Sequence, residues 1–374
     1  MKEIKKHSCP ICSIPLVEYE RYPLYVCLEC SNNVTDIKGK RLAFCNVDLT
    51  GGFSAKYIDS GRNYNSHTCY IEGIECYADE ARFGGIVVQK VISEINDSSE
   101  LESASLDAGI FSKKNYIMGA IIGDVIGSVY EWHNVKTTEF QLFSQKTHFT
   151  DDSVLTFATM DSILHQIGYT QVYQTYAKKF PDRGYGGKFT SWINTNHPRP
   201  YNSWGNGSAM RVSPVGWAYD TLDEVLAQAK KSAEVTHNHP EGIKGAQATA
   251  SAIFLSRKGK SKLEIKQYIE QTFNYNLDRS IAEIRPAFRF DESCQGTVPE
   301  AIIAFLESTD FENAIRFAIS LGGDSDTIAC ITGGIAEAFY KEIPEFIIES
   351  SLRVLPAEII ELIVKFSLKF RKLD

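Results

Sequence analysis

The sequence predicts a mainly helical protein with a small β-rich domain at its N-terminus. Apolar residues recur at helical spacing through most of the chain from about residue 113 onward. The first ninety residues lack this periodicity and contain short β-like runs, such as Leu24–Val26 and Gly85–Val88, between turn signals. We therefore expect three parts: a β-rich domain at 1–90, a linker at 91–112 and a helical domain at 113–374.

Composition limits what the protein can be. The 374 residues suffice for two or three domains, and 43% hydrophobic with 23% charged residues excludes a disordered or fibrous chain. The formal net charge of −8 argues against broad binding to nucleic acid or anionic membrane, although a local basic surface stays possible. No apolar stretch reaches the roughly 18 residues of a membrane span. Nine cysteines, mostly near the N-terminus, do not resemble a secreted disulfide scaffold, so we expect a reduced, cytoplasmic compartment.

Local signals mark the linker and several helices. Residues 91–112 are acidic and rich in serine with no basic residue, which predicts a solvated linker, although one amphipathic turn is an alternative. Thr221 and Glu224 have the spacing of a capping box before an apolar helix. Asp310 precedes another periodic run and is expected to cap it. The helical part shows no repeat of fixed period and no traceable strands.

Four cysteines near the N-terminus have the spacing of a zinc site. Cys9-Pro-Ile-Cys12 and Cys27-Leu-Glu-Cys30 form two C-x-x-C pairs, and two such turns supply four thiolates for a tetrahedral cation. We predict one structural Zn²⁺ in a zinc-ribbon-like fold, without a catalytic role because a four-thiolate site has no open position. The alternatives are reduced cysteines packed as small hydrophobes, or a redox motif. A second, more loosely spaced set comprises Cys45, His67, Cys69 and Cys76.

Two acidic motifs lie far apart in the helical part. Thr150-Asp151-Asp152 stands directly before one apolar helix, and Asp324, Asp326 and Thr327 follow two glycines before another. Each motif taken alone is also a good helix cap. Together they hold more carboxylate than caps require, and like charges at two converging helix starts need a cation to neutralise them. Oxygen ligands of this kind suit Mg²⁺ or Mn²⁺.

Three further motifs accompany the acidic pair. Gly123 and Gly127 form a small-residue stripe that allows close helix packing, and Glu131 follows the stripe and is expected to reach a cleft. The segment 201–211 alternates Gly with Asn and Ser, which suits either a plain turn or a phosphate-binding loop. His237 stands at a helix end, where it can cap the helix, join the core or contact a ligand.

In this order, these five elements resemble the ADP-ribosylglycohydrolase family, from about Tyr116 to Tyr340. The resemblance implies an orthogonal multi-helix domain with two Mg²⁺ or Mn²⁺ ions on one face. It implies that Glu131 lies beside the metals, and that Glu131 or the ligand Asp152 transfers the proton in catalysis. The implied metal ligands are Thr150, Asp151, Asp152, Asp324, Asp326 and Thr327. The implied substrate contacts are Gly205, Asn206, Gly207, Ser208 and His237 near phosphates and ribose, and Tyr201 or Trp204 on adenine.

The implied function is metal-dependent hydrolysis of the glycosidic bond between ADP-ribose and an acceptor such as arginine. Its partner would be an ADP-ribosylated macromolecule or another ADP-ribose conjugate, and not a membrane. One alternative is a catalytically inactive ADP-ribose-binding or crystallin-like protein, which the presence of all six ligands disfavours. Another is a hydrolase of ADP-ribosylated nucleic acid targeted by the zinc ribbon, which the acidic balance disfavours.

Overall fold

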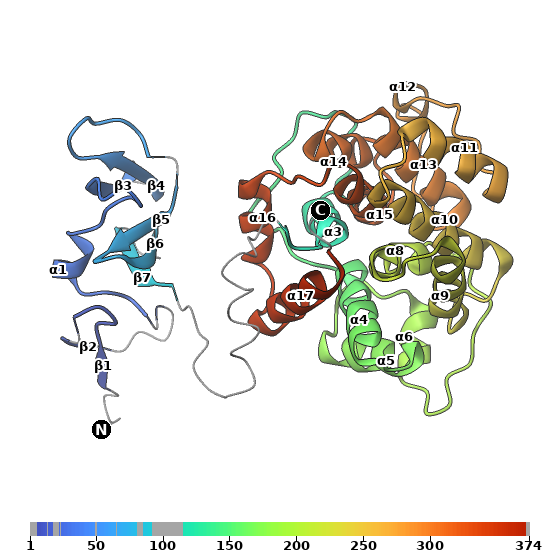
Figure 1. Cartoon of the computed structure of the whole chain (residues 1–374), viewed down its shortest axis with the longest axis horizontal. Helices are drawn as coiled ribbons and strands as arrows, with labels where there is room; N and C mark the ends of the chain where they lie inside the picture. Colours follow the sequence, from blue (N-terminus) through green and yellow to red (C-terminus); the bar gives the residue numbers. More distant parts are fainter. Residues whose placement is uncertain are drawn as a thin grey trace. The chain divides into compact units, whose positions relative to one another are not determined.

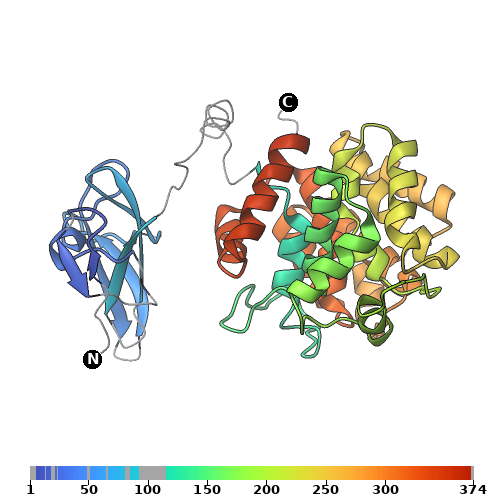
Figure 2. The same ribbon diagram turned by 90° about the horizontal axis from the view of Figure 1, so that it is seen from below.

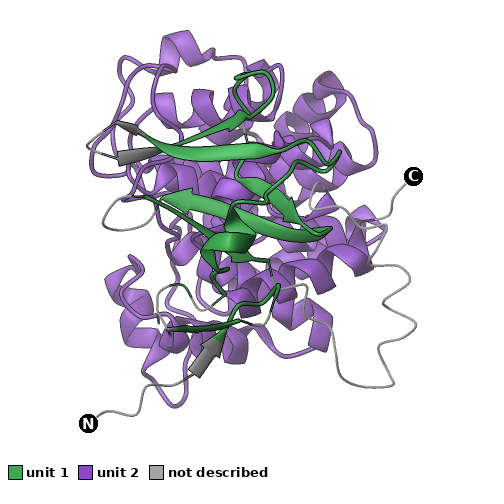
Figure 3. Ribbon diagram, turned by 90° about the vertical axis from the view of Figure 1, so that its left-hand side faces the viewer, with its two compact units in different colours: residues 1–101 green, residues 102–374 purple. Residues whose placement is uncertain are grey.

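The computed structural model describes residues 6–12, 14–17, 22, 24–48, 51–64, 66–80, 85–91 and 115–371. The chain divides into two compact units, residues 1–101 and 102–374 (Figure 3). Apart from Val91, the linker predicted at 91–112 lies outside the described residues. Among the helices that are described, none has both the length and the apolar character needed to cross a bilayer.

Short antiparallel strands form the described part of the first unit. They are β1 (Lys6–Ser8), β2 (Pro15–Val17), β3 (Leu42–Asp48), β4 (Gly51–Tyr57), β5 (Thr68–Ile71), β6 (Ile74–Glu80) and β7 (Ile86–Lys90). β1 pairs with β2, β3 pairs with β4, and the order β5-β6-β7 makes a three-stranded sheet. The two predicted β-like runs lie side by side, because the Val26 amide donates to the Val88 carbonyl at 2.9 Å. A short helix, α1 (Leu28–Ser31), completes the described elements.

The second unit is helical, which confirms the predicted fold class. Its described helices include α3 (Gly119–Gly127), α4 (Asp151–His165), α5 (Tyr169–Lys179), α6 (Gly187–Ile193), α7 (Gly207–Met210), α8 (Ser213–Ala218), α9 (Leu222–Glu234) and α10 (Pro240–Arg257). They continue with α11 (Lys262–Phe273), α12 (Ile281–Ile284), α13 (Cys294–Glu307), α14 (Phe311–Ser320), α15 (Ser325–Tyr340), α16 (Glu345–Leu352) and α17 (Ala357–Phe370). The predicted caps are present: Thr221 and Glu224 form a capping box, and Asp310 accepts from the Asn313 amide at 2.8 Å.

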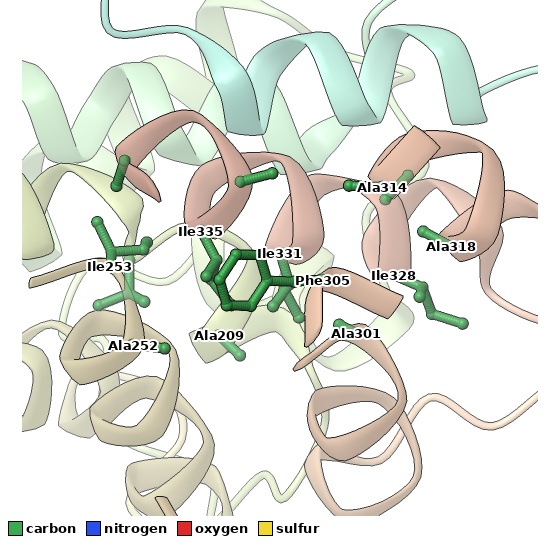
Figure 4. Close-up of a cluster of buried hydrophobic side chains, with 14 of the residues drawn as sticks. Ala209, Ala252, Ile253, Ala301, Phe305, Ala314, Ala318, Ile328, Ile331 and Ile335 are labelled. Atoms are coloured by element: carbon green, nitrogen blue, oxygen red, sulfur yellow. The ribbon is translucent and has the colours of Figure 1, made fainter. Parts of the chain in front are cut away.

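α15 lies in the middle of the helical unit and is buried along most of its length. It packs against α3, α10, α13 and α14. In Figures 1 and 2, α16 and α17 lie on one side of the α3–α15 pair, and α10 and α13 lie on the other. Figure 4 shows the apolar contacts around α15. Its labelled side chains are Ala209, Ala252, Ile253, Ala301, Phe305, Ala314, Ala318, Ile328, Ile331 and Ile335.

Glycines let α3 and α15 pack backbone to backbone, as the small-residue stripe predicts. A Cβ atom added at Gly123 would lie 2.0 Å from the Ala329 carbonyl oxygen, and one at Gly127 would lie 2.4 Å from the Asp326 Cα atom. Neither contact leaves room for a side chain. The pairing brings the C-terminal end of α3 against the first turn of α15, where the second acidic motif lies.

A buried ion pair fixes the start of α3 to the end of the chain. Arg371 Nη1 donates to Glu337 Oε1 at 2.8 Å, and the Glu337 side chain is fully buried. Glu337 Oε2 also accepts from the backbone amides of Met118 and Gly119, at 3.1 and 2.7 Å. Because the carboxylate takes up the unpaired amides at the start of α3, it fixes that helix on α15.

Candidate functional site

The four predicted zinc ligands meet in the first unit. Cys9, Cys12, Cys27 and Cys30 form one group whose sulfur atoms all lie within 4.8 Å of one another. The Cys9–Cys30 sulfur distance is 3.9 Å and the Cys12–Cys27 distance is 3.5 Å. A tetrahedron with Zn–S bonds of about 2.3 Å has sulfur–sulfur edges of about 3.8 Å. The cysteine group therefore has the dimensions of a zinc site.

The more loosely spaced second set does not converge. Among the described residues, no group of three or more potential metal ligands contains Cys45, His67, Cys69 or Cys76. Cys69 and Cys76 face each other across β5 and β6 and are fully buried. His67 stacks on Phe53 with ring centroids 3.8 Å apart. Cys69 and Cys76 therefore belong to the small core of the first unit, whereas Cys45 is exposed.

In the second unit, the two acidic motifs come together at the starts of α4 and α15. The Thr327 hydroxyl donates to Asp152 Oδ2 at 3.2 Å and links the motifs directly. Asp152 Oδ1 is buried and has no hydrogen-bond partner among the described residues. Carboxylate oxygens converge within 4.8 Å in two groups of three. These groups are Asp124, Asp152 and Asp326, and Glu131, Asp324 and Asp326.

Asp124, on α3, accepts hydrogen bonds from the start of α4. Its side chain is fully buried and accepts from the Thr150 amide at 2.9 Å and from the Thr150 hydroxyl at 2.6 Å. The Ser153 amide, at 3.1 Å, and the Ser153 hydroxyl also donate to it. With four donors on its two oxygens, Asp124 fixes the orientation of Thr150 and of the first turn of α4.

Neighbouring loops position the other ligand candidates. Asn206 Nδ2 donates to Asp324 Oδ2 at 2.6 Å, so the glycine-rich loop touches the second acidic motif. The Asp151 amide donates to the Arg183 carbonyl at 2.8 Å. Unlike Asp152, Asp151 is outside both groups of converging carboxylates.

Glu131 is tied to the same loop as Asp324. Asn134, three residues after Glu131, donates to the Gly323 carbonyl at 3.0 Å and accepts from the Gly323 amide at 2.7 Å. Lys136 Nζ donates to the Leu321 carbonyl. These contacts join the segment after α3 to the loop between α14 and α15.

Burial and the neighbouring negative charges raise the pKa of the carboxyl groups in this cluster. Burial raises the pKa of Asp151, Asp152 and Asp326 well above its ordinary value, and the surrounding carboxylates raise it further. Burial and the charge of Asp324 raise the pKa of Glu131 to about 7. Carboxylates brought this close repel one another without a cation. This repulsion, the oxygen-only donors and the unpartnered Asp152 oxygen fit a hard divalent ion.

A pocket of about 350 Å³ contains nearly all of the predicted site residues. Glu131, Tyr201 and His237 line it, together with the two acidic motifs. Gly205, Asn206 and Gly207 of the glycine-rich loop line it as well. Ser208 does not: its side chain is fully buried and its hydroxyl donates to the Gly242 carbonyl at 2.7 Å.

Other residues that line the same pocket were not predicted from the sequence. The loop before α6 contributes Arg183 and Gly184, α6 contributes Lys188, and the α12–α13 loop contributes Phe290 and Glu292. These segments carry no local motif, because ordinary surface loops have the same composition. Asp124 was also not predicted, because its partners Thr150 and Ser153 lie 26 and 29 positions along the chain.

Comparison with known proteins identifies the family of the helical part. The family model described as ADP-ribosylglycohydrolase matches residues 114–371, which include both acidic motifs, the glycine-rich loop and His237. The chain belongs to the ADP-ribosylglycohydrolase family. The cysteine group lies outside the match, so the family domain is the helical unit.

Relatives in this family are similar along most of their length. The chain is 26% identical to ADP-ribosylhydrolase ARH3 of Mus musculus over 313 residues, which covers 61% of this chain and 84% of that protein. It is 27% identical to the Homo sapiens ADP-ribosylhydrolase ARH3 over 315 residues, with 61% and 86% covered. A solved structure titled as an ADP-ribosylglycohydrolase-related protein complex matches with a TM-score of 0.55 at 20% identity, covering 69% of this chain and 97% of that one. That match shows a common fold.

Proposed function

We propose that this ADP-ribosylglycohydrolase family member hydrolyses the bond between the anomeric carbon of ADP-ribose and a side-chain atom of an acceptor, with two Mg²⁺ or Mn²⁺ ions bound. The observation that carries the proposal is the convergence of Asp152, Asp324 and Asp326 from two distant helix starts at the wall of one pocket. Bringing buried carboxylates together destabilises the fold, and an ADP-ribose-binding protein without catalytic activity would not need such a cluster.

Thr150, Asp151, Asp152, Asp324, Asp326 and Thr327 are the residues proposed to hold the ions. When bound, two such cations supply positive charge that orients the ribose hydroxyls and favours ionisation of an attacking water. The surrounding carboxylates would stabilise the positive charge that develops on the ribose ring as the glycosidic bond breaks. Glu131 lines the pocket beside Asp324 and Asp326, where it could transfer a proton to or from the reacting groups.

Arginine is the acceptor that the pocket suits best. Phe290 and Glu292 line it, and Trp132 stacks on Phe290 with ring centroids 5.9 Å apart. Trp132 is 76% exposed and Phe290 is 48% exposed. A guanidinium is planar and cationic, so it can stack on an aromatic ring while its N–H groups bond a carboxylate such as Glu131 or Glu292. A serine hydroxyl would use neither feature.

The cysteine group is proposed to bind one structural Zn²⁺. Two backbone amides already donate to its sulfurs: Cys27 N to Cys9 Sγ at 3.3 Å, and Cys30 N to Cys27 Sγ at 3.4 Å. Such bonds favour thiolates, which zinc requires. The ion would stabilise a unit whose short strands enclose a small core.

Release of ADP-ribose from defined conjugates tests the proposal. The full chain should release ADP-ribose from an ADP-ribosyl-arginine peptide with Mg²⁺ or Mn²⁺, and chelator should abolish the release. Release from ADP-ribosyl-serine instead would overturn only the acceptor. Release from no conjugate, or undiminished release in chelator, would contradict the metal-dependent hydrolase.

Matched variants separate the site from the fold. Asp152→Asn and Asp326→Asn should lower kcat by at least about 100-fold, because each removes a charge from the reacting centre. Asp161→Asn is the control on the same helix as Asp152, since Asp161 pairs with His165 on the surface and does not line the pocket. Full activity of Asp152→Asn would rule out its proposed role.

A further inference from the structure

Arg211 is a fully buried guanidinium at the wall of the pocket. Its Nη2 atom donates to the Ser232 carbonyl at 2.7 Å and to the Thr236 hydroxyl at 2.8 Å. The face of the buried Tyr173 ring lies 4.3 Å from its Cζ atom. Among the described residues, Nε and Nη1 have no hydrogen-bond partner. Removing such a cation from water costs free energy, so we expect its positive charge to stabilise a bound anion.

Thr236 connects this guanidinium to His237. The Thr236 hydroxyl oxygen lies 2.7 Å from His237 Nδ1. Because arginine can only donate, the hydroxyl accepts from Arg211 and keeps its own proton for another group. Among the described residues, His237 Nδ1 is the only acceptor in hydrogen-bond contact with that hydroxyl. Nδ1 therefore accepts, and the ring proton is on Nε2.

The other side of the ring faces the glycine-rich loop. A Cβ atom added at Gly207 would lie 3.1 Å from His237 Nε2, and one added at Gly205 would lie 3.7 Å from it. A ligand group resting on this loop would meet the Nε2–H donor directly. Burial and the charge of Arg211 also lower the pKa of His237 well below its ordinary value, so the ring stays neutral.

Resting on the proposed function, we infer that Arg211 is a positioning residue that acts through Thr236 to hold His237 as an Nε2–H donor to a phosphoryl oxygen of the ligand. The guanidinium adds a fixed positive charge behind that donor, which suits a diphosphate. Glycine at position 207 leaves the Nε2–H group accessible, because the Cβ atom of any other residue would lie 3.1 Å from Nε2. The arrangement selects for an anion independently of the acceptor.

Nitrogen-15 NMR of the histidine side chains in the metal-free full chain tests the tautomer without turnover. Wild-type His237 should be protonated at Nε2 alone, and inorganic pyrophosphate should shift that resonance. Thr236→Val should mix the two tautomers and weaken pyrophosphate binding about tenfold, the usual effect of losing a hydrogen bond to a charged group. Thr236→Ser restores the hydroxyl and should rescue both.

Thr249→Val is the matched control, because the buried Thr249 hydroxyl has no hydrogen-bond partner among the described residues. It should change neither the tautomer nor the affinity. A proton on Nδ1 in the wild type would overturn the inference, as would a Thr236→Val variant with unchanged tautomer and affinity. Neither measurement uses hydrolysis, so failure of the proposed function would appear separately, as missing ADP-ribose release.

Discussion

Substitution of Gly123 by alanine tests whether the α3–α15 contact sustains both the fold and the site. An added Cβ atom would lie 2.0 Å from the Ala329 carbonyl oxygen and 2.7 Å from the Cys330 amide nitrogen. Both atoms belong to the backbone of α15, so no side-chain rotation can relieve the overlap. Restoring an ordinary contact of at least 3.4 Å requires the two helices to separate by about 1.4 Å.

The expected cost follows from that displacement. Overpacking a close-packed core costs about 1–3 kcal/mol, and a clash with backbone atoms belongs at the upper end. A loss of about 3 kcal/mol lowers the Tm of a domain of this size by roughly 6–12 °C. The separation would also move Asp124 and Glu131 away from Asp326, so Mg²⁺ should raise the Tm of the variant less than that of the wild type.

Thermal unfolding followed by circular dichroism, with and without Mg²⁺, measures both effects. Gly187→Ala is the control, because Gly187 begins α6 and an added Cβ atom there meets nothing within 4 Å. Its Tm should stay the same or rise slightly, since alanine restricts the unfolded chain. A Gly123→Ala protein with wild-type Tm and Mg²⁺ response would show that the helices do not pack as described.

Three further outcomes are expected. Asp326→Asn should raise the Tm of the metal-free protein by about 2–4 °C, because it relieves repulsion between buried carboxylates, and should remove the stabilisation by Mg²⁺; a lower Tm without metal would contradict this account of the cluster. Cys30→Ser should reduce bound zinc from about one ion per chain to nearly none, measured by atomic emission, and retention of the ion would refute the four-thiolate site. Arg371→Met should destabilise the protein by about 3–5 kcal/mol in urea unfolding, because it leaves the Glu337 carboxylate buried and unpaired, whereas adding Glu337→Gln should recover part of the loss.

The sequence predicted those parts of the fold that depend on neighbours in the chain. The Thr221 capping box and the Asp310 cap involve residues three apart, and the structure has both. The glycine stripe also predicted close helix packing, although it could not identify α15 as the partner. The fold class could be predicted from the helical spacing of apolar residues that begins near residue 113.

Features that depend on long-range packing were less accessible. Asp124 contacts Thr150 across 26 positions, and no local pattern distinguishes such a carboxylate from a tolerated polar residue in a helix. The Arg183 loop lines the pocket because α5 and α6 place it there. For Ser208, the glycine-rich motif did not reveal which side chain points inward, since that depends on contact with Gly242. Residue type suggests chemistry, whereas the assembled helices decide which groups can take part.

The two-way hydrogen bond between Asn134 and Gly323 has a consequence for ligand response. The pair of hydrogen bonds holds the segment that begins at Glu131 and the turn that precedes Asp324 together, so that they are expected to move as one rigid unit. A cation that binds Asp324 and shifts it should therefore also shift Glu131. Conversely, an acceptor that displaces Glu131 should change the affinity for the cation. Metal binding and acceptor binding are therefore expected to be thermodynamically linked, each strengthening the other.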